Sequence, residues 1–149
     1  MVFREATVND ILQIQIVRHS VMENRLSNPA LVTDADCVEY LTVRGKGWVC
    51  VIENIIVGFA IADLKEKNIW ALFVKPEFEK RGIGKRLLDM MLEWYFNQHQ
   101  DYVWLSTAQN TRAEKFYAMT GWTRVAILPN GEVKFEMTKE NFYRNLHSI

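Results

Sequence analysis

The chain has 149 residues, enough for one compact domain that buries most of the surface its unfolded form exposes, and no linker rich in Pro, Gly or Ser divides it. Eighteen basic and eighteen acidic side chains give a formal net charge of zero, which argues against a nucleic-acid-binding protein. No apolar run reaches the roughly 18 residues of a membrane span, and residues 1–4 lack the order of a signal peptide. We therefore expect one domain, residues 1–149, that is cytoplasmic and binds neither nucleic acid nor membrane.

The first third of the chain predicts a strand and two helices. Residues 2–6 alternate as a strand does, and Thr7 can cap a helix. The apolar positions of that helix are Ile11, Ile14 and Val17. Residues 24–33 contain Asn-Pro and little periodicity, so we predict a loop, after which Thr33 caps a second helix that ends near Arg44.

Three strands are predicted next, followed by a long helix. Residues 48–52, 56–64 and 68–74 are apolar and β-rich, and Glu53-Asn54 can form the first turn between them. From residue 82 to about residue 97 the apolar side chains fall on one helical face.

The last third of the chain predicts strands around one more helix. The predicted elements are a strand at 102–106, a helix at 111–119, a hairpin of 123–128 and 133–137 around Asn130-Gly131, and a terminal helical turn at 141–147. The whole order is β-α-α-β-β-β-α-β-α-β-β. It predicts an α/β (α+β) fold with a seven-stranded, mostly antiparallel mixed sheet flanked by about four helices.

The two cysteines, Cys37 and Cys50, form no CxxC pair and have no suitably spaced histidines. Buried free thiols are therefore predicted, and no metal site. The five tryptophans are interpreted as core packing rather than as a ligand cage.

The junction between the strand at 68–74 and the helix at 82–97 has the composition of an anion site. Unpaired N–H groups of a first helical turn attract negative charge, and Gly82 and Gly84 allow a phosphate to approach the backbone. The neighbouring cations are Lys80, Arg81, Lys85 and Arg86. The segment lacks the Gly-Lys-Ser/Thr of a phosphate-binding P-loop and the third glycine of a dinucleotide fingerprint. A tight turn with a solvated basic edge is the alternative reading of the glycines alone.

Residues 72–88 resemble the acetyl-CoA motif of the GNAT superfamily, Val-x-Pro-x-x-Arg/Gln-x-x-Gly-x-Gly/Ala before a helix. Val74, Pro76, Gly82 and Gly84 match it in register, whereas Glu79 stands where Arg or Gln is usual. We expect Glu79 to turn outward, with Arg81 and Arg86 compensating. A second similarity lies in residues 110–122, where Asn110 and Tyr117 keep the superfamily's spacing.

The resemblance implies a GNAT-like acyl-CoA N-acyltransferase fold with acetyl-CoA as co-substrate and no metal. The residues it assigns to cofactor binding are Leu72, Phe73, Val74, Lys80, Arg81, Gly82, Ile83, Gly84, Lys85, Arg86 and Asn110. It also implies a splay beside the strand at 68–74 that leaves the backbone N–H groups of Phe73 and Val74 free for the pantetheine amide or the thioester oxygen.

Tyr117 is the predicted catalytic residue. When an amine attacks a thioester, the departing sulfur gains negative charge, and a phenol can donate a proton or hydrogen bond to it. The alternative is that Tyr117 packs its ring in the core beside Phe116.

The base that accepts the proton of the amine is left open. Glu23, Asp63 and His19 are the candidates, although Asp63 could equally be a strand-end residue that faces solvent. The resemblance implies that residues 18–27 shape the acceptor pocket, and their polar side chains favour a polar small-molecule acceptor, with a solvated helix end as the alternative.

The predicted function is direct transfer of the acetyl group of acetyl-CoA to a primary amine of a small molecule or peptide, without an acyl-enzyme. A non-catalytic CoA-binding or sensor domain of the same fold is the main alternative, and a nucleotide-phosphate enzyme is a third reading. Dimerisation is common in the resembled family, so the predicted hairpin at 123–137 is a possible homodimer surface.

Overall fold

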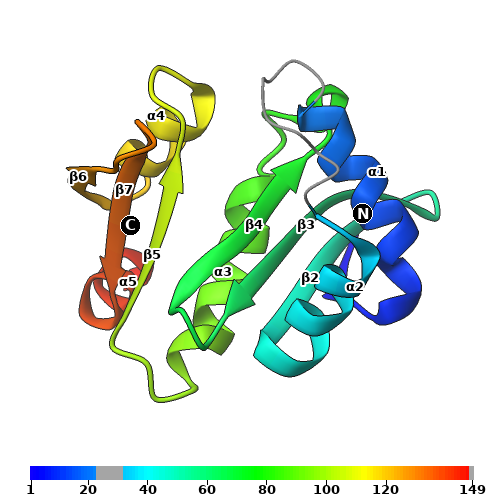
Figure 1. Cartoon of the computed structure of the whole chain (residues 1–149), viewed down its shortest axis with the longest axis horizontal. Coiled ribbons are helices and arrows are strands. Elements are labelled where there is room, and N and C mark those ends of the chain that lie inside the picture. Colours follow the sequence, from blue (N-terminus) through cyan, green and yellow to red (C-terminus); the bar gives the residue numbers. More distant parts are fainter. Residues whose placement is uncertain (23–31, 148–149) are drawn as a thin grey trace. The chain divides into compact units, whose positions relative to one another are not determined.

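The computed structural model describes residues 1–22 and 32–147, and it divides into two compact units, residues 1–94 and 95–149 (Figure 1). Glu23 and residues 24–31 of the predicted loop at 24–33 lie outside the described residues. Each unit is described by itself.

The first unit contains a four-stranded antiparallel sheet in the order β1-β2-β3-β4. Its strands are β1 (Val2–Glu5), β2 (Gly45–Ile52), β3 (Ile55–Asp63) and β4 (Asn68–Val74). The turn between β2 and β3 is the predicted Glu53-Asn54, which adopts the left-handed backbone that a tight hairpin needs, with φ of 51° and 66°.

Three helices belong to this unit: α1 (Ile11–Met22), α2 (Asp34–Glu39) and most of α3 (Ile83–Phe96). Thr33 caps α2, because its side chain accepts a hydrogen bond from the N–H of Asp36 at 3.1 Å while Asp36 accepts from the N–H of Thr33. A π-helical turn at Tyr40–Arg44 prolongs α2, so the helical segment ends at the predicted residue.

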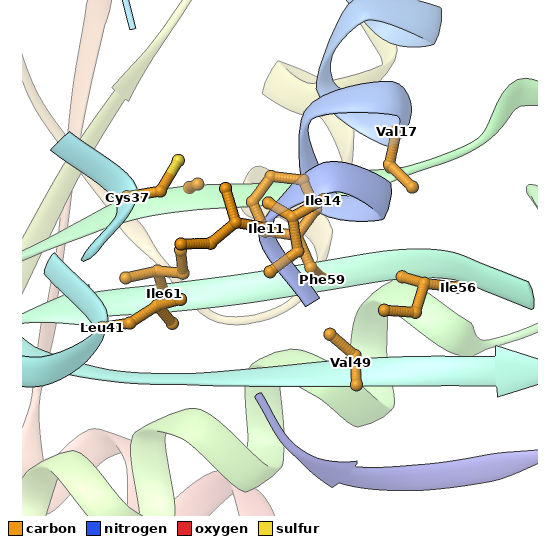
Figure 2. Close-up of a cluster of buried hydrophobic side chains, with 10 residues drawn as sticks. Ile11, Ile14, Val17, Cys37, Leu41, Val49, Ile56, Phe59 and Ile61 are labelled. Atoms are coloured by element: carbon orange, nitrogen blue, oxygen red, sulfur yellow. The ribbon is translucent and has the colours of Figure 1, made fainter. Parts of the chain in front are cut away.

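One face of the sheet packs against α1 and α2. Figure 2 shows Ile11 and Ile14 of α1 gathered with Phe59 and Ile61 of β3, and Leu41 lies beside them. Val17, also predicted to be apolar and inward, is fully buried in the same cluster. The apolar stripe of α1 therefore faces the sheet as the sequence pattern predicts.

The opposite face of the sheet packs against α3. A Cβ atom at Gly58 of β3 would lie 3.2 Å from Ile83 and 3.3 Å from Leu87, so the strand and the helix pack closely at this glycine. Since neighbouring strand residues point to opposite faces, Phe59 meets α1 while Gly58 meets α3.

The strand β2 begins at Gly45, three residues earlier than the pattern of bulky residues predicts. Gly45 pairs with Asp63, and a Cβ at that position would collide with the backbone oxygen of Ala62. Sequence patterns usually place glycines in turns. Gly45 instead lies in a strand, where its missing side chain lets two backbones approach closely.

The second unit contains an antiparallel sheet in the order β5-β7-β6, with helices α4 and α5. Its elements are β5 (Tyr102–Thr107), α4 (Arg112–Met119), β6 (Thr123–Ile127), β7 (Val133–Thr138) and α5 (Lys139–His147). The predicted hairpin forms, with Gly131 at a φ of 86° in its turn. The helix α5 starts two residues before the predicted turn at 141–147.

The predicted fold class is confirmed: seven strands, mostly antiparallel, combine with helices in the predicted order. Residues 1–22 and 32–147 contain five α-helices where about four were expected, because the terminal turn extends into a full helix. Cys37 and Cys50 are free and buried, as predicted. Within residues 1–22 and 32–147, no helix is both long enough and apolar enough to cross a membrane.

Candidate active site

The predicted anion site lies in the first unit, where a single turn of 3-10 helix at Pro76–Phe78 joins β4 to α3. The N–H of Arg86 donates to the carbonyl of Gly82 at 3.1 Å, which identifies Gly82 as the residue that caps α3. The amides of the first turn, Ile83, Gly84 and Lys85, precede the first intrahelical donor and so have no carbonyl acceptor within the helix. This is the geometry that favours an anion at a helix start.

The two glycines keep this helix start uncrowded. Gly82 has a φ of 80°, which side chains rarely allow, and no heavy atom lies within 4 Å of the position of its missing Cβ. A Cβ at Gly84 would meet only Val74, at 3.8 Å. The two glycines thus leave this backbone uncrowded, and its amides and the neighbouring cations are groups that suit the pyrophosphate of coenzyme A.

The four predicted cations are all exposed around this turn, but they differ in their contacts. Lys85 forms an ion pair of 2.6 Å with Asp89, one helical turn later. The guanidinium of Arg86 lies 4.4 Å from the ring centroid of Phe3, and that of Arg81 lies 5.0 Å from the ring centroid of Phe78. Lys80 adopts a left-handed backbone, with a φ of 64°.

Glu79, the residue that departs from the motif, is half-buried rather than fully turned out to solvent. Its N–H donates to the carbonyl of Pro76 at 3.3 Å, and its backbone is extended. The expectation that the Glu79 carboxylate turns outward stays a prediction.

The register of β4 corrects one expected backbone donor. The N–H of Lys75 donates to the carbonyl of Val57 at 2.8 Å, and Phe73 is paired with Phe59 two residues back along the strand. Because directly hydrogen-bonded pairs alternate in antiparallel strands, the amide of Phe73 faces β3 and that of Val74 faces away from it. The expectation of a free N–H at Phe73 is therefore wrong. The amide of Leu72, like that of Val74, faces away from β3.

Asn110 lies in the second unit, directly before the residue that caps α4. It adopts a left-handed backbone with a φ of 60°, and its N–H donates to the carboxylate of Glu114 at 2.9 Å. Thr111 caps the helix, accepting a hydrogen bond from the N–H of Glu114. The Asn110 side chain is thus carried on an exposed turn whose backbone is fixed by Glu114.

Tyr117 is buried in the second unit, with 7% of its surface exposed. Its ring packs edge-on against Phe116 at 5.2 Å and Trp122 at 5.5 Å, and lies 5.9 Å from Phe135. Burial raises the pKa of the Tyr117 hydroxyl, so the phenol is protonated at neutral pH. The ring packing and a proton-donating role are compatible.

The candidates for the base separate in the structure. Asp63 is buried, and its carboxylate accepts hydrogen bonds from Nε and Nη2 of Arg44 at 3.2 and 2.6 Å. The idea that Asp63 faces solvent is wrong, and its bond to Arg44 gives it a structural role. His19 is exposed on the last turn of α1, and Glu23 lies outside the described residues.

One feature of the first unit was missed by sequence reasoning. Arg18 of α1 is buried among three aromatic rings from β3 and β4, those of Phe59, Trp70 and Phe73. The sequence pattern places Arg18 at a helix end and Trp70 in the core, and only the packing of α1 on the sheet brings them together.

Comparison with known proteins identifies the family. The chain matches the acetyltransferase (GNAT) family over residues 9–122, more than half of its length. It is 30% identical over 92 residues to a [ribosomal protein bS18]-alanine N-acetyltransferase of Haemophilus ducreyi, a match that covers 60% of this chain and 63% of that protein. The chain therefore matches less than two thirds of the length of this curated relative.

Solved structures agree in fold. The PaiA N-acetyltransferase of Thermoplasma acidophilum in complex with coenzyme A superposes with a TM-score of 0.78 at 15% identity, covering 92% of this chain and 98% of the other. A ribosomal-protein-alanine N-acetyltransferase of Brucella melitensis gives a TM-score of 0.76 at 17% identity, with 93% and 99% covered. The family match, which includes both the strand-turn-helix at 74–84 and the segment of Asn110 and Tyr117, shows that this chain belongs to the GNAT acetyltransferase family.

Proposed function

We propose that this protein transfers the acetyl group of acetyl-CoA directly to a primary amine of a small molecule or peptide. The observation that carries the proposal is the uncrowded helix start at Gly82 and Gly84 within a chain that matches the acetyltransferase family. The thioester supplies the activated acetyl group. The protein's own residues bind and orient the cofactor and donate a proton to the departing sulfur.

Binding rests on the first unit. The amides of Ile83, Gly84 and Lys85 hold the pyrophosphate, and Lys80 and Arg81 add charge from the exposed turn. The outward amide of Val74 is the donor for the pantetheine arm or the thioester oxygen. Asn110 of the second unit contacts the pantetheine arm, as the family resemblance implies.

Tyr117 supplies the proton for the departing sulfur. Its raised pKa keeps the hydroxyl protonated at neutral pH, which is the state that a donor needs. The aromatic side chains around the Tyr117 ring fix its position, so the ring does not have to be ordered during the reaction.

The acceptor is an amine that is neutral when it attacks. Relatives are named as N-acetyltransferases of a ribosomal-protein alanine, and this supports peptides beside small amines as acceptors. No base is assigned among Asp63 and His19, since Asp63 is held by Arg44 and His19 is solvent-exposed.

Cofactor binding is tested by isothermal titration with acetyl-CoA, ATP and NAD. We expect the protein to bind acetyl-CoA alone, and Gly84→Glu to abolish that binding because a carboxylate would occupy the helix start. Gly84→Ala is the matched control: its methyl group meets only Val74 at 3.8 Å, so it retains binding. Loss of binding in both variants, or binding of ATP or NAD instead, contradicts the proposal.

Catalysis is tested with Tyr117→Phe and a panel of amines. We expect kcat to fall by roughly 100-fold while the affinity for acetyl-CoA is unchanged, because general-acid catalysis contributes at least about that factor. Tyr143→Phe in α5 is the control for the loss of a hydroxyl elsewhere. Acetyl-CoA binding without turnover of any amine in the parent protein would instead favour a sensor.

A further inference from the structure

Arg18 has surroundings unlike those of a surface arginine. It lies in the last two turns of α1 with only 6% of its surface exposed. Its guanidinium carbon is 4.8 Å from the ring centroid of Trp70, 5.3 Å from that of Phe73 and 5.5 Å from that of Phe59. We call these three rings and Arg18 the arginine box. Aromatic faces attract a cation, but they accept few of its five N–H donors.

The charge of Arg18 has no anionic partner among the described residues. Its Nε and Nη2 atoms are buried and make no hydrogen bond there. Burial lowers the pKa of the guanidinium. An arginine remains protonated in proteins, so the box holds a desolvated positive charge.

The same chain shows what these two atoms do when they are satisfied. In Arg44, Nε and Nη2 donate to the two oxygens of Asp63 at 3.2 and 2.6 Å. In Arg4, Nη1 and Nη2 donate to the two oxygens of Asp10, each at 2.9 Å. The atoms of Arg18 that lack partners, Nε and Nη2, are thus the atoms with which Arg44 binds a carboxylate. Their planar arrangement matches the two oxygens of a carboxylate.

A second unsatisfied group lies on the same face of α1. Gln15, three residues before Arg18, donates from Nε2 to the carbonyl of Val32 at 3.1 Å, yet its Oε1 atom is buried without a partner among the described residues. Buried polar atoms are normally bonded. The Arg18 donors lack an acceptor and the Gln15 Oε1 atom lacks a donor, so the two groups together point to a ligand that carries both a carboxylate and an N–H group.

The anion in question is separate from the cofactor phosphates. Phe73 points to the face of the sheet that carries α1, whereas Val74 contacts the start of α3 on the other face. Pyrophosphate bound at Gly82 and Gly84 therefore lies across the sheet from the arginine box. The box is nevertheless close to the outward amide of Val74, because Phe73, whose ring lies against the guanidinium of Arg18, is the preceding residue of β4.

We propose that Arg18 binds a carboxylate of the acceptor, so that the preferred substrates are amines that carry a carboxylate a few bonds from the nucleophile. The proposal rests on the proposed function, because the amide of Val74 marks the acetyl position. Arg18 is then the residue that determines acceptor specificity, and Phe59, Trp70 and Phe73 hold its guanidinium in place.

The test compares matched acceptors. Glycine, β-alanine and 4-aminobutyrate are assayed beside their carboxamides, with the parent protein, Arg18→Gln, Arg18→Lys and the control Arg144→Gln, which changes an exposed arginine of α5. We expect at least one carboxylate to exceed its carboxamide in kcat/KM by about 10- to 100-fold, the usual worth of hydrogen bonds to a charged group. Arg18→Gln removes this preference, Arg18→Lys retains part of it, and Arg144→Gln changes nothing.

A binding arm separates this inference from the proposed function. Titration of the six compounds in the presence of saturating CoA measures carboxylate recognition without turnover. Carboxylate binding that Arg18→Gln abolishes supports the inference even if no acetyl transfer occurs. Three results would overturn the inference: the parent protein binds carboxylates and carboxamides equally, Arg18→Gln still prefers carboxylates, or Arg18→Gln loses CoA affinity to the same extent. The acetyltransferase proposal is tested separately, by the titration with acetyl-CoA. Far-UV circular dichroism checks that Arg18→Gln is folded.

Discussion

Arg44 and Arg18 lie in the same unit and differ in what surrounds their charge. Arg44 sits at the end of the π-helical turn, with its side chain over Tyr40 and bonded through two nitrogens to buried Asp63. Arg18 is the more buried of the two and has aromatic rings but no carboxylate among the described residues. The two sites are connected by ring stacking, since Tyr40 stacks on Trp70 at 4.0 Å.

The difference appears in the pKa values of the two groups. The hydrogen bond to Asp63 raises the pKa of the Arg44 guanidinium, whereas burial lowers that of Arg18. The fold therefore stabilises the charge of Arg44 and tolerates that of Arg18 at a cost in free energy. Groups held at such a cost are found preferentially at functional sites. We therefore expect Arg44 to contribute mainly to stability and Arg18 mainly to function.

The largest effect on stability is expected for Arg44→Met. It leaves the carboxylate of Asp63 buried without its partner, and we expect the midpoint of thermal unfolding to fall by roughly 10 °C. Adding Asp63→Asn should restore part of the loss, because the buried charge is then gone. Equal unfolding midpoints for Arg44→Met and the double variant would show that the Arg44–Asp63 ion pair does not stabilise the first unit.

An intermediate effect is expected for the ion pair between Arg4 of β1 and Asp10 of the 3-10 turn that precedes α1. Hydrogen bonds from Arg4, whose side chain is 44% exposed, lower the pKa of the Asp10 carboxyl. At pH 7, Asp10→Asn should lower the unfolding midpoint by about 4 °C, since a partly exposed pair contributes less than a buried one.

The pH dependence of that effect follows from the sign of the shift. A carboxyl whose pKa is lowered by folding contributes its stability above its unfolded pKa of about 4 and loses it as the pH falls through the folded value. The difference in midpoint between the parent protein and Asp10→Asn should therefore shrink between pH 5 and pH 2. A difference that stays constant across this range would contradict the assignment.

The smallest effect on stability is expected for Arg18→Met. The substitution removes a desolvated charge and leaves apolar atoms among three rings, so we expect the unfolding midpoint to change by less than about 3 °C in either direction. Differential scanning calorimetry beside Arg44→Met makes the comparison direct. A fall as large as that of Arg44→Met would make Arg18 a structural residue.

The sequence alone determined the order of the elements, the caps and the helix start of the candidate site. Thr7 and Thr33 cap helix starts as predicted, and Gly82 and Gly84 stand where the helix α3 begins, because capping and glycine chemistry act over a few neighbouring residues. The apolar periodicity of α3 and the Asn-Gly turn are equally local signals.

The tertiary structure decided which polar residues are bonded to one another. Asp63 is held by Arg44, nineteen residues away, and the amide of Phe73 is turned toward β3 by the register of two strands. Arg18 and Trp70 are brought together only by the packing of α1 on β4. These contacts join segments far apart in the chain, and the pattern of any one segment holds no information on the partner that packing assigns to it.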